Sequence, residues 1–120
     1  MPHNTAVSLL ATLTAVPLLA IAGNLSFLGD APLAKMSSKD LEQLAASIQS
    51  VLNTGSDGET VPWEQEEPNS GGALTPLKTY SAYGTKCREL KITNNAGGTS
   101  GKSRFHFCFN KKENTWKILK

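Results

Sequence analysis

Two cysteines, Cys87 and Cys108, are the side chains with the clearest chemistry in this chain of 120 residues. Each lies in a run in which apolar and polar residues alternate, and such alternation predicts a half-buried β-strand. A hairpin whose loop is the polar segment 94–101 places Cys87 directly opposite Cys108. An even number of cysteines is typical of disulfides in exported chains, and the N-terminal residues described below favour export, so we predict a bridge between Cys87 and Cys108. Closing a loop of this length stabilises the fold by about 3 kcal/mol in the chain-entropy model.

Two other uses of the cysteines fit less well. A structural zinc site needs four ligands, and only His106 lies near the two sulfur atoms in this hairpin. A reactive dithiol usually has Cys-x-x-Cys spacing, which this pair lacks. We therefore assign no metal ligand and no cofactor to the cysteines.

The same hairpin places Glu89 opposite His106, a combination that could transfer protons. In this register one face is apolar and the other carries the cysteines and the charges. The apolar face holds Leu90, Ile92, Phe105, Phe107 and Phe109, and the polar face holds Cys87, Glu89, Lys91, Arg104, His106 and Cys108. A histidine and a glutamate on a solvent-facing sheet surface are more typical of a cross-strand pair than of a catalytic base.

Carboxylates gather in a second segment, Thr54 to Gly72, which Gly and Pro residues mark as a loop. They are Asp57, Glu59, Glu64, Glu66 and Glu67, and Trp63 lies among them. Clustered carboxylates could form an acid–base pair or bind a cation. The spacing is not that of an EF-hand and no His or Cys lies nearby, so we expect a solvated acidic loop and a Trp63 that closes the edge of a small core. No catalytic residue is assigned.

A helix from about Lys39 to Asn53 is the first element expected to support the hairpin. Its apolar residues recur every three or four positions and are Leu41, Leu44, Ala45, Ile48, Val51 and Leu52. Ser37 or Ser38 can cap its start, and Gly55 is expected to end it in a left-handed conformation. We expect the apolar stripe to pack on the sheet.

The remaining strands lie on both sides of the cysteine hairpin. Residues 73–80 predict an edge strand that tolerates Pro76, followed by a turn at 81–84. A second turn at 110–115 places Phe109 opposite Trp116 and Phe107 opposite Ile118. The expected fold class is α+β: one N-terminal amphipathic helix packed on a small antiparallel β-meander of about four strands, stapled by the disulfide.

The N-terminal residues differ sharply from the rest. Residues 1–29 contain no Lys, Arg, Asp or Glu, and residues 6–22 are almost entirely apolar or small. The end of this run at Ala22 fits the small-residue rule for signal-peptidase cleavage, so residues 1–22 are expected to be a signal peptide and the chain to be exported. An uncleaved membrane anchor and a buried core helix are the alternatives. Residues 23–37 are expected to be a linker and residues 38–120 the folded domain.

The net charge of +2 and the pI of about 8.6 are too mild to indicate a nucleic-acid partner. Lysines cluster near the C-terminus, at Lys111, Lys112, Lys117 and Lys120. They could contact anionic lipid or polymer, which leaves peripheral membrane association open, although a solvated charged surface is the favoured interpretation.

Over about residues 40–120 the chain resembles the C-terminal domain of the rickettsial 17 kDa surface antigen family. The matching positions are Trp63, Ser70–Gly71, Thr75–Pro76, Tyr80, Gly84–Glu89, Gly97–Gly98, Cys108 and Trp116. The chain departs from the family pattern at Gln65, where the pattern has Asn, and at Glu113–Thr115, where it has an Asp-Gly turn. The family's Gly-rich membrane-inserting segment and lipid-attachment cysteine have no counterpart here, so lipid anchoring is not carried over.

The resemblance implies a bacterial cell-envelope protein without enzymatic activity, in the periplasm or on the outer membrane. The expected function is therefore that of a structural or binding module whose partner is another envelope protein or polymer. The alternative is a small secreted inhibitor or a hydrolase that acts on an envelope polymer. A hydrolase would need a nucleophile with its base, or a carboxylate pair, in a cleft.

Overall fold

A computed structural model of the chain describes residues 25–28, 31–63 and 70–119. The elements in chain order are η1 (Leu25–Leu28), η2 (Ala31–Lys35), α2 (Ser38–Thr54), β1 (Val61–Pro62), β2 (Ser70–Ala82), β3 (Thr85–Ala96), β4 (Thr99–Asn110) and β5 (Thr115–Ile118). The strands form one antiparallel sheet in the order β1-β2-β3-β4-β5. The α+β class is confirmed, with five strands where about four were expected. The expected signal peptide, residues 1–22, lies outside the described residues.

Helix α2 forms where its apolar periodicity predicted it. Ser37 is the N-cap, and its Oγ accepts a hydrogen bond from the backbone N–H of Asp40 at 3.1 Å. The prediction of a left-handed Gly55 was wrong, because this residue is extended, with φ −70°. A Cβ atom at Gly55 would lie 2.7 Å from the carbonyl oxygen of Val51, so the glycine permits a close approach of the chain to the helix end.

The cysteine hairpin has the predicted register. Cys87 pairs with Cys108 and Phe107 pairs with Ile118. The loop is shorter than the expected 94–101, because β3 and β4 continue to a two-residue turn at Gly97–Gly98, with φ angles of 55° and 81°. Such positive angles suit glycine and match the twist of the flanking strands.

Strand β2 is longer than the predicted 73–80 and contains an irregularity. Its register against β3 shifts by one residue between Pro76 and Lys78. The prediction that residues 73–80 form an edge strand is only partly right, because the short strand β1 pairs with Ala73 and Leu74 and leaves Pro76 without a paired strand residue on that side in the described residues. The shift alters which β2 side chains face each side of the sheet.

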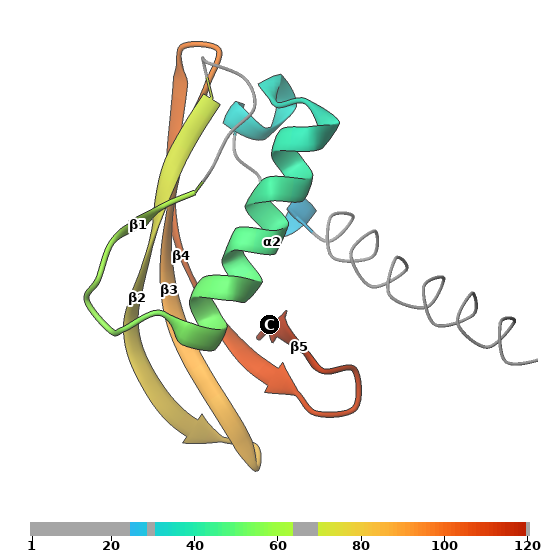
Figure 1. Cartoon of the computed structure of the whole chain (residues 1–120), viewed down its shortest axis with the longest axis vertical. Helices are drawn as coiled ribbons and strands as arrows, with labels where there is room; N and C mark the ends of the chain where they lie inside the picture. The colour runs from blue at the N-terminus through green and yellow to red at the C-terminus, as the bar shows by residue number, and fades with distance from the viewer. Residues whose placement is uncertain (1–24, 29–30, 64–69, 120) are drawn as a thin grey trace, which may run out of the picture.

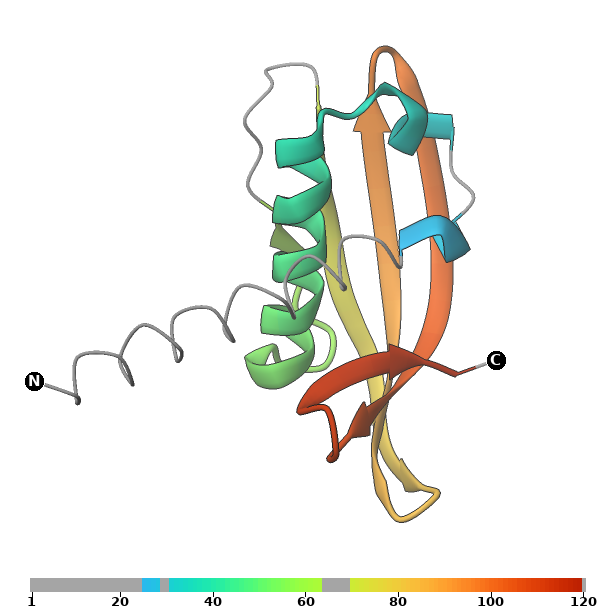
Figure 2. The ribbon, with the colours of Figure 1, turned by 90° about the vertical axis from the view of Figure 1, so that its right-hand side faces the viewer.

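The helix and both short 3-10 turns cover the same face of the curved sheet (Figures 1 and 2). The core between these layers consists of Leu44, Ala45, Ile48, Val51 and Leu52 from α2, of Leu74, Leu90, Ile92, Ala96, Phe107 and Trp116 from the sheet, and of Trp63. The segment expected as a linker contributes Leu25, Leu28 and Met36 to this core. The opposite face of the sheet carries no helix in the described part of the chain.

Gln49 connects α2 to the last strand. Its side-chain amide donates to the carbonyl of Trp116 at 3.0 Å and accepts from the backbone N–H of Trp116 at 2.9 Å. The Trp116 indole N–H donates to Asn53 Oδ1 at 2.8 Å. The helix thus satisfies backbone groups of the edge strand that would otherwise face solvent.

In the described residues no helix has the length and apolar character to cross a bilayer.

Candidate functional site

The disulfide between Cys87 and Cys108 is present, as predicted, with Cα atoms 4.0 Å apart. The two residues occupy directly opposed positions on adjacent strands, and Cys87 is fully buried. Disulfides form and persist mainly in oxidising, extracytoplasmic compartments. In the described part of the chain no cysteine is free, so neither sulfur is a thiol nucleophile or a metal ligand.

The Glu89–His106 pair lies on the uncovered sheet face. Glu89 Oε2 is 3.9 Å from both His106 Nε2 and Arg104 Nη1, which is too long for a hydrogen bond. The closer partner of His106 is Tyr80, whose hydroxyl lies 2.7 Å from His106 Nδ1. The His106 side chain is 46% exposed, so this cluster is a surface network on an open sheet and not a base held in a cleft.

One carboxylate of the acidic segment, Asp57, has contacts that were not expected. Asp57 was predicted to be a solvated carboxylate, yet its Oδ1 accepts from Arg88 Nη2 at 2.7 Å and from the Thr79 hydroxyl at 2.8 Å. Glu59 is exposed, as expected. The expectations for residues 64, 66 and 67 lie outside the described residues. Within the described ranges no group of three His, Cys, Asp or Glu could hold a metal ion.

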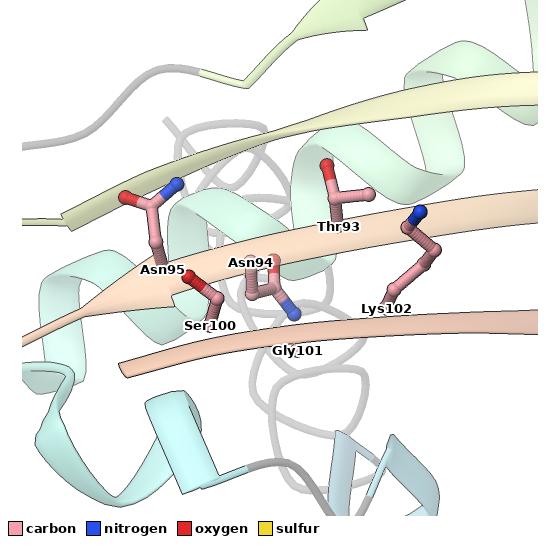
Figure 3. Close-up of a pocket in the computed structure, with 6 residues that line it drawn as sticks. All are labelled: Thr93, Asn94, Asn95, Ser100, Gly101 and Lys102. Carbon is pink, nitrogen blue, oxygen red and sulfur yellow. The ribbon is translucent and has the colours of Figure 1, made fainter. Parts of the chain in front are cut away.

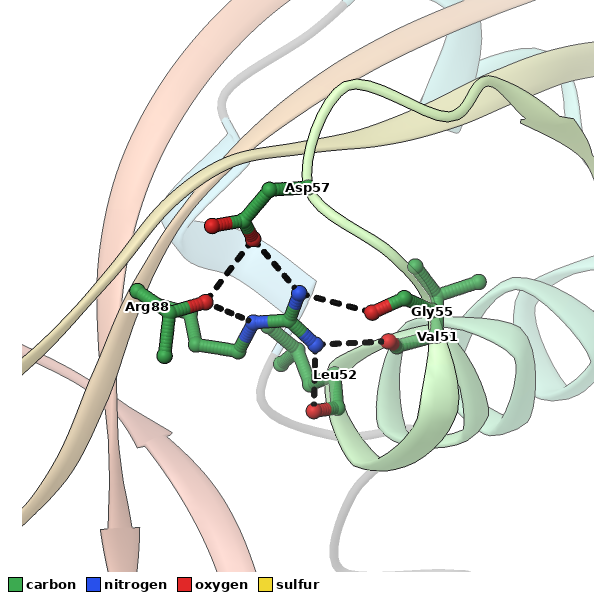
Figure 4. A network of polar contacts seen from close by, with 6 residues as sticks. Val51, Leu52, Gly55, Asp57 and Arg88 are labelled. Atoms are coloured by element: carbon green, nitrogen blue, oxygen red, sulfur yellow. Dashed lines mark hydrogen bonds and ion pairs between the residues drawn. The ribbon is translucent and has the colours of Figure 1, made fainter.

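Arg88 is the residue whose importance sequence reasoning missed. It is only 4% exposed and projects from β3 toward the C-terminal end of α2 (Figure 4). Its guanidinium donates to the carbonyls of Val51 at 3.2 Å, Leu52 at 2.9 Å and Gly55 at 2.7 Å. The last carbonyls of a helix have no partner inside the helix and carry its negative dipole end, so a cation there is favourable.

Two further contacts complete the Arg88 network. The Nε group donates to Thr79 Oγ1 at 2.8 Å on the neighbouring strand, and Nη2 binds Asp57. The hydrogen bond from Arg88 Nη2, and next the one from the Thr79 hydroxyl, hold the pKa of the Asp57 carboxyl below its ordinary value. The network links the helix end, the loop after it and two strands, so its geometry indicates a structural role. The one sequence signal was that Arg88 alternates in step with the core residues Leu90 and Ile92.

Trp63 fills part of the core, as predicted. The indole N–H donates to Asn94 Oδ1 at 3.2 Å across strand β2. The residue between them is Gly72, where a Cβ atom would lie 2.5 Å from the indole nitrogen and 2.0 Å from the Thr93 carbonyl. The glycine therefore provides the space that the indole crosses.

The uncovered sheet face is rich in cations. Lys91 on β3 pairs directly with Arg104 on β4, and Lys102 lies two residues from Arg104 on the same face. Beside them is a shallow depression of about 250 Å³ near the Gly97–Gly98 turn (Figure 3). It is lined by Thr93, Asn94, Asn95, Ser100, Gly101 and Lys102. This surface offers positive charge together with hydroxyl and amide groups.

No protein-family model, curated protein or solved structure matches the chain in the comparisons made with them. The resemblance to the rickettsial surface antigen family therefore stays a hypothesis based on the spacing of its motifs. A proposal about the function of this chain therefore depends on the geometry of the sites described above and not on similarity to a known protein.

Proposed function

We propose that this chain is an exported, non-enzymatic module of a bacterial cell envelope that binds another envelope component. The observation that carries the proposal is the disulfide between the directly opposed Cys87 and Cys108. A bridge of this kind suits an oxidising compartment outside the cytoplasm. The apolar N-terminal residues 1–22, with their small-residue end, support the same compartment.

A binding role, in place of a catalytic one, is supported by the positions of the charged side chains in the fold. Arg88 and Asp57 join the helix to the sheet, and the cluster of Tyr80, His106 and Glu89 lies on an open surface. Neither arrangement places a nucleophile and a base against an enclosed substrate site. The uncovered sheet face, in contrast, carries no helix in the described part of the chain and is available to a partner.

In-cell photocrosslinking followed by fractionation tests this proposal. A photoreactive residue at the exposed position Asn95 on the uncovered face is compared with one at Ala46 on the outer side of α2. We expect adducts with an envelope component from position 95, recovered in the extracytoplasmic fraction, and few from position 46. A chain that stays in the cytoplasm, or equal crosslinking from both positions, would contradict the proposal.

A further inference from the structure

Three cations of β3 and β4 lie on the uncovered sheet face, and two of them occupy positions that folding alone does not favour. Lys91 and Arg104 are directly opposed residues of the β3–β4 ladder. Side chains at such positions begin about 5 Å apart, and like charges there destabilise the sheet. Lys102 lies about 7 Å farther along β4, on the same face.

Little negative charge on the same face offsets these three cations. Glu89 is the neighbouring carboxylate, and it already lies near both Arg104 and His106. In the described residues Lys91 and Lys102 form no ion pair. Lys102 and Arg104 are exposed, and the Arg104 side chain is 66% accessible. A ligand that carries anionic groups would relieve this repulsion when it binds.

The polar groups beside the cations narrow the class of ligand. Thr93, Asn95 and Ser100 point to the same side of the sheet as Lys102 and line the shallow depression (Figure 3). The Thr93 hydroxyl is already hydrogen-bonded to the backbone of Ala73, so the exposed Asn95 and Ser100 are the groups that a ligand reaches most easily. Hydroxyl and amide side chains on an open surface suit the hydroxyl groups of sugars, because both partners donate and accept hydrogen bonds. Three separate cations can each pair with an acidic group when such groups repeat along a polymer.

Two other polyanions fit this surface less well. Docking on a bilayer would be strengthened by apolar side chains that insert into it, and the exposed large hydrophobic residues of the described chain, Tyr83 and Leu119, lie outside the depression. Single-stranded nucleic acid is usually bound on aromatic stacking platforms. The aromatic residue on this face is Tyr80, which is engaged edge-on with His106.

We propose that the β3–β4 surface formed by Lys91, Thr93, Asn95, Ser100, Lys102 and Arg104 binds an anionic polysaccharide, with the cations paired to its carboxylate or phosphate groups. This inference rests on the proposed binding role and names the class of its partner. Because the contacts are solvent-exposed ion pairs, the affinity is modest and decreases as the salt concentration rises.

The test is a binding measurement with the full chain, its disulfide intact, and a polyuronate oligosaccharide at low and at physiological salt. The variant carries Lys91→Gln, Lys102→Gln and Arg104→Gln. Its control carries Lys39→Gln, Lys86→Gln and Lys112→Gln, which removes the same charge from exposed positions elsewhere. We expect the first variant to bind about tenfold more weakly or worse, since three exposed ion pairs are lost together, and the control to change less than about threefold.

A phosphorylated polysaccharide, used in a parallel arm, distinguishes the two kinds of acidic group, and binding of either supports the inference. Folding of the variant is verified by its disulfide and its circular dichroism, and relief of the Lys91–Arg104 repulsion should leave it at least as stable as the parent. Equal losses in both variants, no binding of either acidic polymer, or preferential binding of a neutral glucan, anionic vesicles or single-stranded DNA would overturn the inference. A chain that binds the polymer but stays in the cytoplasm would overturn only the proposed function.

Discussion

Replacement of Arg88 by methionine tests how the helix is held to the sheet. Methionine retains an apolar stem and removes the charge together with all five hydrogen bonds that the guanidinium donates. Leu52 is fully buried, so its carbonyl would lose a donor that water does not easily replace, and the half-buried carbonyl of Gly55 would lose a donor as well. Each such unsatisfied group costs about 1–3 kcal/mol.

The carboxylate of Asp57 contributes less to this loss. Its side chain is 44% exposed, so water can solvate it once Arg88 is absent. The carbonyl of Val51 still accepts the backbone N–H of Gly55 at 2.7 Å. We therefore expect Arg88→Met to lower the free energy of unfolding by about 3–5 kcal/mol, a large part of the roughly 5–15 kcal/mol typical of a small domain.

Urea denaturation followed by tryptophan fluorescence and circular dichroism measures this loss. The matched variant Arg88→Lys retains the charge, but an ammonium group cannot reproduce the planar fork that reaches Thr79, Asp57 and the helix carbonyls together. It should lose about 2 kcal/mol. A loss below about 1 kcal/mol for Arg88→Met, or equal losses for both variants, would refute the view that Arg88 anchors the helix end.

Three further predictions concern stability. Gly72→Ala should destabilise the fold by about 1–3 kcal/mol or more in the same denaturation assay, because the added Cβ would lie 2.0 Å from the Thr93 carbonyl; an unchanged midpoint would argue against this packing. Cys87→Ser combined with Cys108→Ser should cost about 3 kcal/mol in the chain-entropy model, and a parent whose midpoint does not respond to reductant would contradict that value. Because hydrogen bonds lower the pKa of Asp57, its stabilising contribution is present above the ordinary carboxyl pKa and is lost as the pH falls through the folded-state value, below about pH 4. Asp57→Asn should therefore flatten the acid limb of a stability-against-pH curve, and an unaltered limb would exclude this contribution.

The hairpin could be predicted because two independent patterns agree on one register. A single pairing brings Cys87 to Cys108 and also separates the apolar from the polar side chains. The helix followed from its apolar stripe and its Ser37 cap, which are local signals. The second hairpin, with Phe109 opposite Trp116, followed for the same reason.

The residues that the sequence did not assign depend on contacts between distant segments. Arg88 occupies a core-facing strand position, and only the arrival of the helix end and Asp57 explains why a cation is stable there. Tyr80 reaches His106 across a register that shifts after Pro76, and no pattern in the sequence indicates that shift. The sequence predicted that Trp63 lies in the core. It could not predict that the indole crosses Gly72 to reach Asn94, because that contact depends on the order of the strands in the sheet.

Export to an oxidising compartment is tested most directly by the intact mass of the protein from the envelope fraction of the cells that produce it, after thiol alkylation with and without prior reduction. We expect a chain that begins near Gly23, in which Cys87 and Cys108 are alkylated only after reduction. A chain that retains Met1 and carries two alkylated cysteines without reduction would contradict export to an oxidising compartment.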